Sequence, residues 1–437
     1  MTRGEQTGER RDPYLALRFV DFRLLMGASL LATLGEQMLT VAIGWEVYDR
    51  TRQAIMLGYT GLAQFAPVLL LSLVAGHVAD RYDRRLVAMA SQGVMALTSI
   101  GLAALSLTHG PVSLIFLLLI ARGTGDVFNV SAFSSLPPQT VTANAFESAA
   151  SWSSSMWQVA AISGPAVAGL IIAAGSSATP VFFFDALAGA ASILLVWRIR
   201  GQQESRSDEG MTLTGLMGGV RFILRTPIIL AAITLDMVAV LLGGATTLLP
   251  VYASDILRVG AAGLGLMAAA PSAGALIMAT ARAYLPPFRH AGRTLLLAVA
   301  GFGLVTIVFG VSRFFPLSLA MLFALGACDN ISVVVRKTLM LTHVPDELRG
   351  RLAAVNNVFI GSSNQLGGFE SGLTAQIFGP PLAVALGGAG SILAVAAVAF
   401  TWPELRRLGR LTAPIGSPRG NAESRSGERL DMAQESR

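Results

Sequence analysis

The stretch GLAQFAPVLLLSLVAGHVADRYDRR, residues 61–85, begins with a long apolar run and ends in a cluster of charges. Extended back to residue 55, the apolar part is long enough for a helix that crosses a bilayer, which takes about 20 residues. The charged end belongs in water at the membrane surface. The segment therefore predicts one membrane-spanning helix followed by a basic loop.

Similar apolar stretches fill most of the 437 residues, of which 53% are hydrophobic and 13% charged. Soluble domains carry roughly 25% charged residues, so composition excludes a water-soluble protein. Barrel strands would be about ten residues of alternating polarity, which these stretches are not. We predict an all-α integral membrane protein with twelve spans, at residues 22–48, 55–78, 86–107, 112–134, 146–173, 180–198, 227–252, 261–284, 294–312, 316–337, 353–378 and 381–402.

The net charge of +6 follows from the membrane topology. With twelve spans and both termini in the cytoplasm, all but five of the 32 Lys and Arg residues fall on the cytoplasmic side. The exceptions are Arg122 inside the membrane and, outside, Arg50, Arg52, Arg258 and Arg313. This is the positive-inside bias, and it explains the basic character without a nucleic-acid partner.

Several kinds of site are disfavoured. The single cysteine, Cys328, excludes an internal disulfide and a cysteine-based metal site. The four histidines lie near segment ends, and no G-x-x-x-x-G-K-[ST] loop occurs, so we expect no metal, no cofactor and no ATP drive. No His-rich or Ser/His/Asp arrangement supports an intramembrane enzyme.

The apolar pattern breaks around residues 199–226, which predicts a cytoplasmic linker with a short amphipathic helix. This divides the chain into a cytoplasmic segment 1–21, a six-helix bundle 22–198, the linker, a second bundle 227–402 and a disordered tail 403–437. The halves match each other: GLAQFAP ends at Pro67 and GLMAAAP at Pro271, and Gly164 and Gly169 recur as Gly367 and Gly372. Such duplications build transporters with a site at the repeat interface, so we predict two pseudo-symmetric bundles.

Ionisable residues lie in particular spans. The first holds Glu36, the fourth Arg122 and Asp126, the seventh Asp236, and the tenth Asp329 and Arg336. Spans three, nine and twelve have no charge in their interiors. Because charge in hydrocarbon is costly, intramembrane charges usually face an aqueous path. We therefore expect the first span of each triplet to line a cavity and the last to face lipid.

Polar residues also form stripes at helical spacing. One stripe is Thr33, Glu36, Gln37 and Thr40, and another is Arg122, Asp126 and Asn129, in which Arg122 and Asp126 can pair. Asp329 and Arg336 share a helix face, and Gln365 and Glu370 add polarity to the eleventh span. Asp185, near the outer end of the sixth span, is expected to reach the membrane interface.

These residues have two interpretations. They can be buried ion pairs that stabilise the bundle, or they can line a polar cavity. Four acids face only two bases on the central spans, which leaves carboxylates without a partner. A carboxylate in a partly wet site of low dielectric holds its proton more tightly, as a proton carrier requires. The excess of acids favours the second interpretation.

The loop GHVADRYDRR resembles the G-x-x-x-D-R-x-x-R-R signature of the major facilitator superfamily. In this loop Gly76 would allow close helix packing, Asp80 would meet a helix end or an arginine, and the arginines would anchor at anionic headgroups. The resemblance implies a conformational latch formed by Gly76, Asp80, Arg81, Arg84 and Arg85. The second-half counterpart, around Tyr284 to Arg293, lacks the Asp-Arg pair, so the latch is expected to be asymmetric.

Gly164, Pro165 and Gly169 resemble the antiporter signature of superfamily exporters, although small-residue helix packing explains them equally well. Arg122 takes the place of the arginine that the family links to proton coupling.

A resemblance over nearly the whole chain, including DNISVVVRKTL and VPDELRGRLAAVNNVFIGSSNQLGGFESG, points to the superfamily branch of bacterial enterobactin exporters and macrolide efflux proteins. Asn364, Gln365 and Glu370 lie in these strings and either contact substrate or join helices, the latter being slightly favoured.

The leading hypothesis is a monomeric secondary transporter of the bacterial inner membrane that exports a small, siderophore- or drug-like molecule by proton antiport. Glu36 and Asp126 would carry protons, Arg122 would tune them, and Asp236, Asp329 and Arg336 would line the second half of the cavity. Its partners are a small-molecule substrate, protons and the bilayer. Proton-coupled uptake is the main alternative; a membrane sensor or scaffold is disfavoured because the tail is too short for an output domain.

Overall fold

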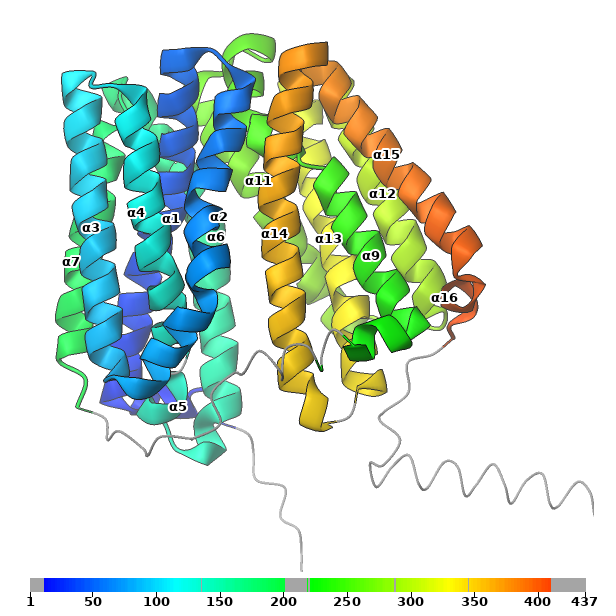
Figure 1. Ribbon diagram of the computed structural model, residues 1–437, viewed down its shortest axis with the longest axis horizontal. Helices are drawn as coiled ribbons and strands as arrows, with labels where there is room; N and C mark the ends of the chain where they lie inside the picture. Colours follow the sequence, from blue (N-terminus) through cyan, green and yellow to red (C-terminus); the bar gives the residue numbers. More distant parts are fainter. Residues whose placement is uncertain are drawn as a thin grey trace, which may run out of the picture. The chain divides into compact units, whose positions relative to one another are not determined.

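The computed structural model describes residues 12–134, 136–200, 218, 221–286, 288–344 and 346–409. Regular structure in these residues is helical throughout, with no strand (Figure 1). Residues 1–11 and 410–437, which include most of the predicted terminal segments, lie outside the described residues. Most of the predicted linker does too; residues 221–225 at its end are helical, and the interfacial position of a linker helix stays a prediction.

The long helices follow the predicted spans. They are α1 (Val20–Thr51), α2 (Ala54–Arg81), α3 (Arg84–Thr108), α4 (Val112–Phe133), α6 (Phe146–Gly175), α7 (Thr179–Trp197), α9 (Pro227–Leu242), α11 (Gly260–Tyr284), α12 (Ala291–Val311), α13 (Phe315–His343), α14 (Asp346–Phe378) and α15 (Pro380–Thr401). Short elements between them are η1 (Leu15–Arg18), α5 (Pro137–Thr140), η2 (Ala143–Ala145), η3 (Ala245–Leu248), α10 (Leu249–Val251), η4 (Tyr252–Ile256) and α16 (Pro403–Arg407).

In the described part of the chain, eleven helical segments are long and apolar enough to cross a membrane. Among the long helices, α14 does not meet this criterion. It covers the predicted eleventh span and carries Asn364, Gln365 and Glu370. The predicted seventh span is not one regular helix: α9 ends at Leu242, and the chain continues through η3 and α10 to the π-helical η4. Two consecutive glycines, Gly243 and Gly244, follow the end of α9 and suit this interruption.

The chain divides into two compact units. The first unit contains residues 1–42 and 66–210. In it α3 packs against both α4 and α7, and α6 packs against α7. Figure 1 shows α3 beside α7 and α4. A small core at the end of these helices joins the start of α1 to α3 and to Ile199, through the buried residues Leu25, Ala88 and Leu136.

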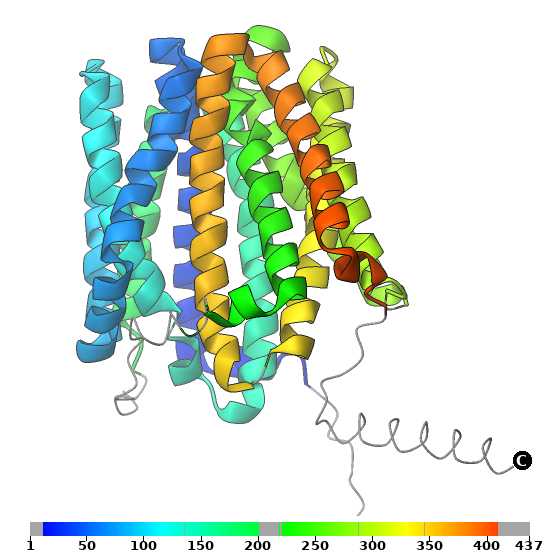
Figure 2. The same ribbon diagram turned by 45° about the vertical axis from the view of Figure 1, so that its right-hand side comes forward.

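The second unit contains residues 211–437 together with residues 43–65, the adjoining ends of α1 and α2. Here α11 packs on α13, α12 on α13 and α15, and α9 on α14 and α15. Figure 2 shows α12 and α15 side by side from a second direction. Close backbone approach is built on glycine: a Cβ on Gly326 of α13 would clash with the carbonyl of Pro271 in α11. Residues 43–65 belong to the second unit although they precede the linker in the chain. The division into two six-helix bundles at the linker therefore stays a prediction.

The chain enters α3 through a capped turn. The Asp83 carboxylate accepts a hydrogen bond of 2.8 Å from the backbone N–H of Arg85, which satisfies one of the free N–H groups at the helix start.

Two other turns show the internal repeat. Arg52 and Arg258 have positive φ angles, of 52° and 55°, and each lies two residues before a helix, α2 and α11 respectively.

Candidate functional site

The first unit contains a buried ion pair between α4 and α7. The guanidinium of Arg122 donates to the Asp185 carboxylate at 2.9 Å and 3.4 Å, and to the hydroxyl of Ser99 on α3 at 2.9 Å. Ser99 in turn donates to Asp185 at 2.5 Å. The two charged side chains are 4% and 7% exposed. Three helices are therefore joined by one closed set of charge-assisted hydrogen bonds.

This arrangement corrects two expectations. Asp185 does not reach the membrane interface, because it is buried against Arg122. Asp126 is not the ion-pair partner of Arg122. A basic residue four positions before an acid is the less favourable order on a helix, and Asp185 offers Arg122 two carboxylate contacts instead. The sequence signal for Asp185 was its position within the apolar run VFFFDALAG.

Arg122 thus forms its ion pair with Asp185, while two further acids of the first unit have no ion-pair partner among the described residues. The side chains of Asp126 on α4 and Glu36 on α1 form no hydrogen bond or ion pair with another described residue. The charges that act on Glu36 are those of Asp126, Arg122 and Asp185. With all four groups ionised the cluster carries a net charge of −2. It can therefore accept a cation, and a proton is the smallest.

Polar neighbours extend this cluster along the same helices. Asn129 is one turn from Asp126, and its side-chain oxygen accepts from the Ser91 hydroxyl at 3.5 Å. Gln37 lies beside Glu36 on α1, where Glu36 and Thr40 are exposed and Gln37 and Thr33 are half-buried. Asn129 and Gln37 therefore lie near the acids, as the helical spacing predicted.

Gly164, Pro165 and Gly169 are all buried in α6. A Cβ on Gly164 would lie 2.7 Å from Cβ of Gln37 and 3.2 Å from the backbone oxygen of Leu34, both on α1. The glycine therefore lets α6 contact the backbone of α1 beside the acid cluster. This contact is the close packing that small residues allow.

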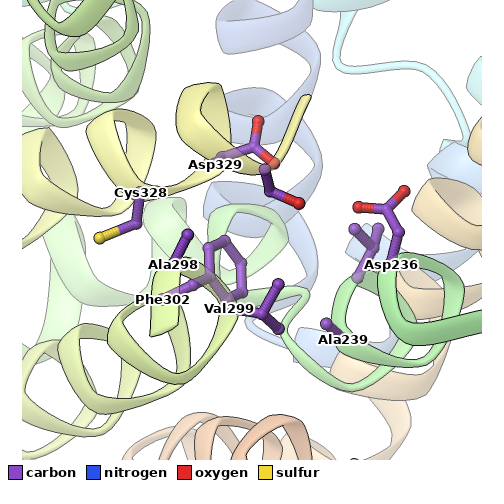
Figure 3. A pocket seen from close by; sticks show the side chains of 9 residues that line it. Asp236, Ala239, Ala298, Val299, Phe302, Cys328 and Asp329 are labelled. Carbon is purple, nitrogen blue, oxygen red and sulfur yellow. The ribbon is translucent and has the colours of Figure 1, made fainter. Parts of the chain in front are cut away.

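The second unit contains its own buried ion pair. Asp236 on α9 pairs with Arg336 on α13, and both are below a tenth exposed. Asp329, two helical turns before Arg336, forms no ion pair or hydrogen bond with another described residue. Asp236 and Asp329 line one pocket, and Figure 3 shows their carboxylates along one edge and the apolar Ala298, Val299 and Phe302 along the other.

The residues of the eleventh span lie where α14 meets other elements of the second unit. A Cβ on Gly61 of α2 would meet the side-chain oxygen of Gln365. A Cβ on Gly367 would lie 2.7 Å from the carbonyl oxygen of Val240 in α9. Glu370 is half-buried and Asn364 is exposed. The contacts of Gln365 support a role in joining helices, whereas Asn364 is free to meet solvent or substrate.

The loop between α2 and α3 differs in part from its expected packing. A Cβ on Gly76 would meet no described atom within 4 Å, so this glycine does not serve close packing here. Arg81 is exposed, and Arg84 donates to the carbonyl of Ala79 at 3.4 Å. Arg85 donates to the carbonyl of Ile199, just after α7. The side chain of Asp80 lies outside the described residues.

A further polar cluster in the second unit was not predicted from the sequence. The Tyr48 hydroxyl, on the end of α1, donates at 2.5 Å to the carboxylate of Asp255 in η4. Arg52 donates to Ser254 at 2.9 Å and to Asp255 at 3.4 Å. These partners are about 200 positions apart in the chain, so no local pattern could reveal them.

A family model described as transmembrane secretion effector matches residues 12–414 of the chain. The multidrug efflux pump Tap of Mycolicibacterium fortuitum is 26% identical over 427 residues, which cover 93% of this chain and all of that protein. The enterobactin exporter EntS of Shigella boydii serotype 4 (strain Sb227) is 23% identical over 394 residues, which cover 90% of this chain and 94% of that protein.

The fold is also found among solved transporters. The crystal structure of the nucleoside transporter NupG superposes with a TM-score of 0.71 at 12% sequence identity, over 87% of this chain and 99% of that one. At this identity the likeness shows the fold alone. It agrees with the predicted twelve-span architecture of two six-helix bundles.

Proposed function

The chain belongs to the transmembrane secretion effectors of the major facilitator superfamily, a family of efflux transporters, and from this membership we propose that it exports a small organic molecule by proton antiport. Export as such follows from the family, since the relatives named above are an efflux pump and an exporter. The coupling to protons and the substrate class are our proposal.

The acid cluster of the first unit is the observation that carries this proposal. Arg122 makes its direct contacts with Asp185 and Ser99, so neither Asp126 nor Glu36 has it as an ion-pair partner. Uptake of one proton by either acid changes the net charge of the cluster from −2 to −1. Because a charge in the membrane interior is costly, this change alters which conformations of the protein are favourable. Protonation can in this way be coupled to alternating access.

The substrate proposal rests on the relatives and on the character of the polar residues. Tap is named for multidrug efflux and EntS for enterobactin. Acids without counter-ions suit an amphipathic or partly cationic compound, whereas a siderophore would use the amide and hydroxyl groups. Asn129, Gln37 and Asn364 are the polar neutral side chains that we assign to substrate contact. Asp236, Asp329 and Arg336 supply the charged groups of the second half.

We further propose that the protein works as a monomer in a bacterial inner membrane, with both termini in the cytoplasm. The positive-inside distribution of Lys and Arg supports this orientation. It places the loop with Arg81, Arg84 and Arg85 at the cytoplasmic surface, where these arginines meet anionic headgroups. Asp80 of the same loop would take part in the conformational latch.

Substrate-triggered proton movement in liposomes tests the proposal. Purified protein is reconstituted with a pH dye inside and an imposed pH gradient, and a catecholate siderophore, a macrolide and ethidium are added in turn. At least one compound should collapse the gradient with the wild type and fail to do so with Glu36→Gln or Asp126→Asn. Glu404→Gln, which removes an exposed carboxylate in α16, is the control and should behave as wild type.

The opposite outcome is equally clear. If a labelled compound crosses the membrane while no compound moves protons, proton antiport is wrong and the carboxylates bind substrate or stabilise the bundle. If an imposed gradient drives the compound in the direction of the proton flow, the protein is a proton-coupled uptake transporter.

A further inference from the structure

The pocket of the second unit lies between α9, α12 and α13 and has room for roughly one water molecule. Three polar side chains line it: Asp236, Asp329 and Ser332. Ser332 is 3% exposed, and its hydroxyl has no hydrogen-bond partner among the described residues. Buried polar groups nearly always have a partner, so this hydroxyl indicates that the pocket holds a polar ligand. Figure 3 shows the pocket from close by.

Few charges act on this pocket. Arg336 and Asp329 act on Asp236, and Arg336 acts on Asp329. Arg336 is already paired with Asp236, so the three groups carry a net charge of −1 when ionised.

The packed helices supply almost no other ionisable group. α12 has none beyond Arg293, α15 has none, and α11 has none before Arg282. On α14, Glu370 is the ionisable residue that follows Arg351. Its charge is not among those that act on Asp236 or Asp329. α13 itself adds Cys328, next to Asp329, and Lys337 and His343 after Arg336.

The pocket has a counterpart in the first unit. α4 begins at Val112 and α13 at Phe315, an offset of 203 residues, and α3 and α12 end with the same offset, at Thr108 and Val311. This offset relates Asp329 to Asp126.

The same offset of 203 residues relates other residues that line the pocket to residues of the first unit. Ser332 corresponds to Asn129, and Ala239 and Val240, which also line the pocket, correspond to Glu36 and Gln37. The pocket thus occupies in the second unit the position that the acid cluster has in the first. The carboxylate on the first helix of the unit lies at Asp236, three residues before Ala239, the position that corresponds to Glu36.

We propose that this pocket is a second proton-binding site, in which Asp329 takes up a proton through a water molecule shared with Ser332 and Asp236. The step transfers one proton from hydronium to the Asp329 carboxylate and leaves one water molecule and a neutral carboxyl group. Asp236 keeps its ion pair with Arg336, and the net charge of the site changes from −1 to 0. The inference rests on the proposed proton antiport and adds a second exchangeable proton to it, in place of substrate contact by Asp329.

Infrared difference spectroscopy of the purified full-length protein tests this without a transport substrate. The C=O stretch of a protonated carboxyl group is recorded as the pH is lowered, in water and in D₂O. Wild type, Glu36→Gln, Asp126→Asn, Asp329→Asn, Ser332→Ala and the control Glu404→Gln are compared. Asp329→Asn should remove a carboxyl band that Asp126→Asn leaves in place, and proton uptake per molecule should fall by one.

Ser332→Ala keeps the carboxylate and removes its hydroxyl neighbour, so it should shift the frequency of the same band without deleting it. This variant also serves if Asp329→Asn does not fold. The inference is overturned if Asp329→Asn and Ser332→Ala leave the spectrum unchanged, or if Na⁺ at constant pH alters the band as acid does.

The outcomes separate the two proposals. Loss of a band in Asp126→Asn together with no change in the Asp329 and Ser332 variants refutes the second site and leaves the antiport proposal standing. If none of the substitutions in either unit changes a carboxyl band, both fail.

Discussion

The Arg122 guanidinium on α4 and the Asp185 carboxylate on α7 form an ion pair 2.9 Å long, with Ser99 of α3 bonded to both. This pair gives the direct contact of Arg122 to Asp185 and not to the neighbouring acids. Asp126 and Glu36 are therefore left as groups that can exchange a proton. A buried ion pair and the proposed coupling site thus share one cluster.

Asp185→Asn is expected to destabilise the protein strongly. It leaves the buried Arg122 without its counter-ion, and breaking a buried pair in this way costs about 3–5 kcal/mol. Thermal unfolding in detergent, followed by intrinsic fluorescence, measures the change. The double variant Arg122→Leu with Asp185→Leu should recover part of the loss, because no uncompensated charge remains. Equal stability of Asp185→Asn and the wild type would show that the pair contributes nothing.

Gly164→Ala is expected to separate α6 from α1. The added Cβ would lie 2.7 Å from Cβ of Gln37, and the overpacking should cost about 1–3 kcal/mol. Gly93→Ala on α3 is the matched control, because its Cβ would meet no described atom within 4 Å. The control should be neutral or slightly stabilising. Measured unfolding temperatures that fall equally in both variants would contradict the proposed contact.

Tyr48→Phe tests the polar cluster that joins the end of α1 to η4. The hydroxyl bond to a charged acceptor, Asp255, should be worth about 1.5–3 kcal/mol. Arg52→Gln at the exposed edge of the same cluster should cost at most about 1 kcal/mol and lose its effect in high salt. Unfolding measured in low and high salt separates the two. A salt-sensitive Tyr48→Phe effect as small as that of Arg52→Gln would refute this ranking.

Removal of residues 410–437 tests the transporter assignment against the sensor hypothesis. A transporter whose site lies in the helical bundles should keep its flux of ethidium when the tail is deleted. A protein that signals through its tail would lose function. Flux in liposomes at matched protein content gives the answer, and a deletion variant that inserts normally yet transports nothing would favour signalling.

The sequence alone determined the class and the spans of this protein, and it predicts the orientation. Apolar runs of about 20 residues and the side on which Lys and Arg gather are local properties of the chain. For the same reason the helical spacing of Asp126 and Asn129, or of Glu36 and Gln37, was predictable: residues three or four apart on a helix share a face whatever the rest of the fold does.

The partners of the charges were decided by the tertiary structure. Asp185 lies 63 positions from Arg122, and Asp236 lies 100 positions from Arg336, so their pairing depends on which helices pack together. The spacing within α4 suggested Asp126 as the partner of Arg122, but a carboxylate from a neighbouring helix makes the better contacts. Which acids are left without an ion-pair partner among the described residues follows from this competition, and the packing of α3, α4 and α7 decides it.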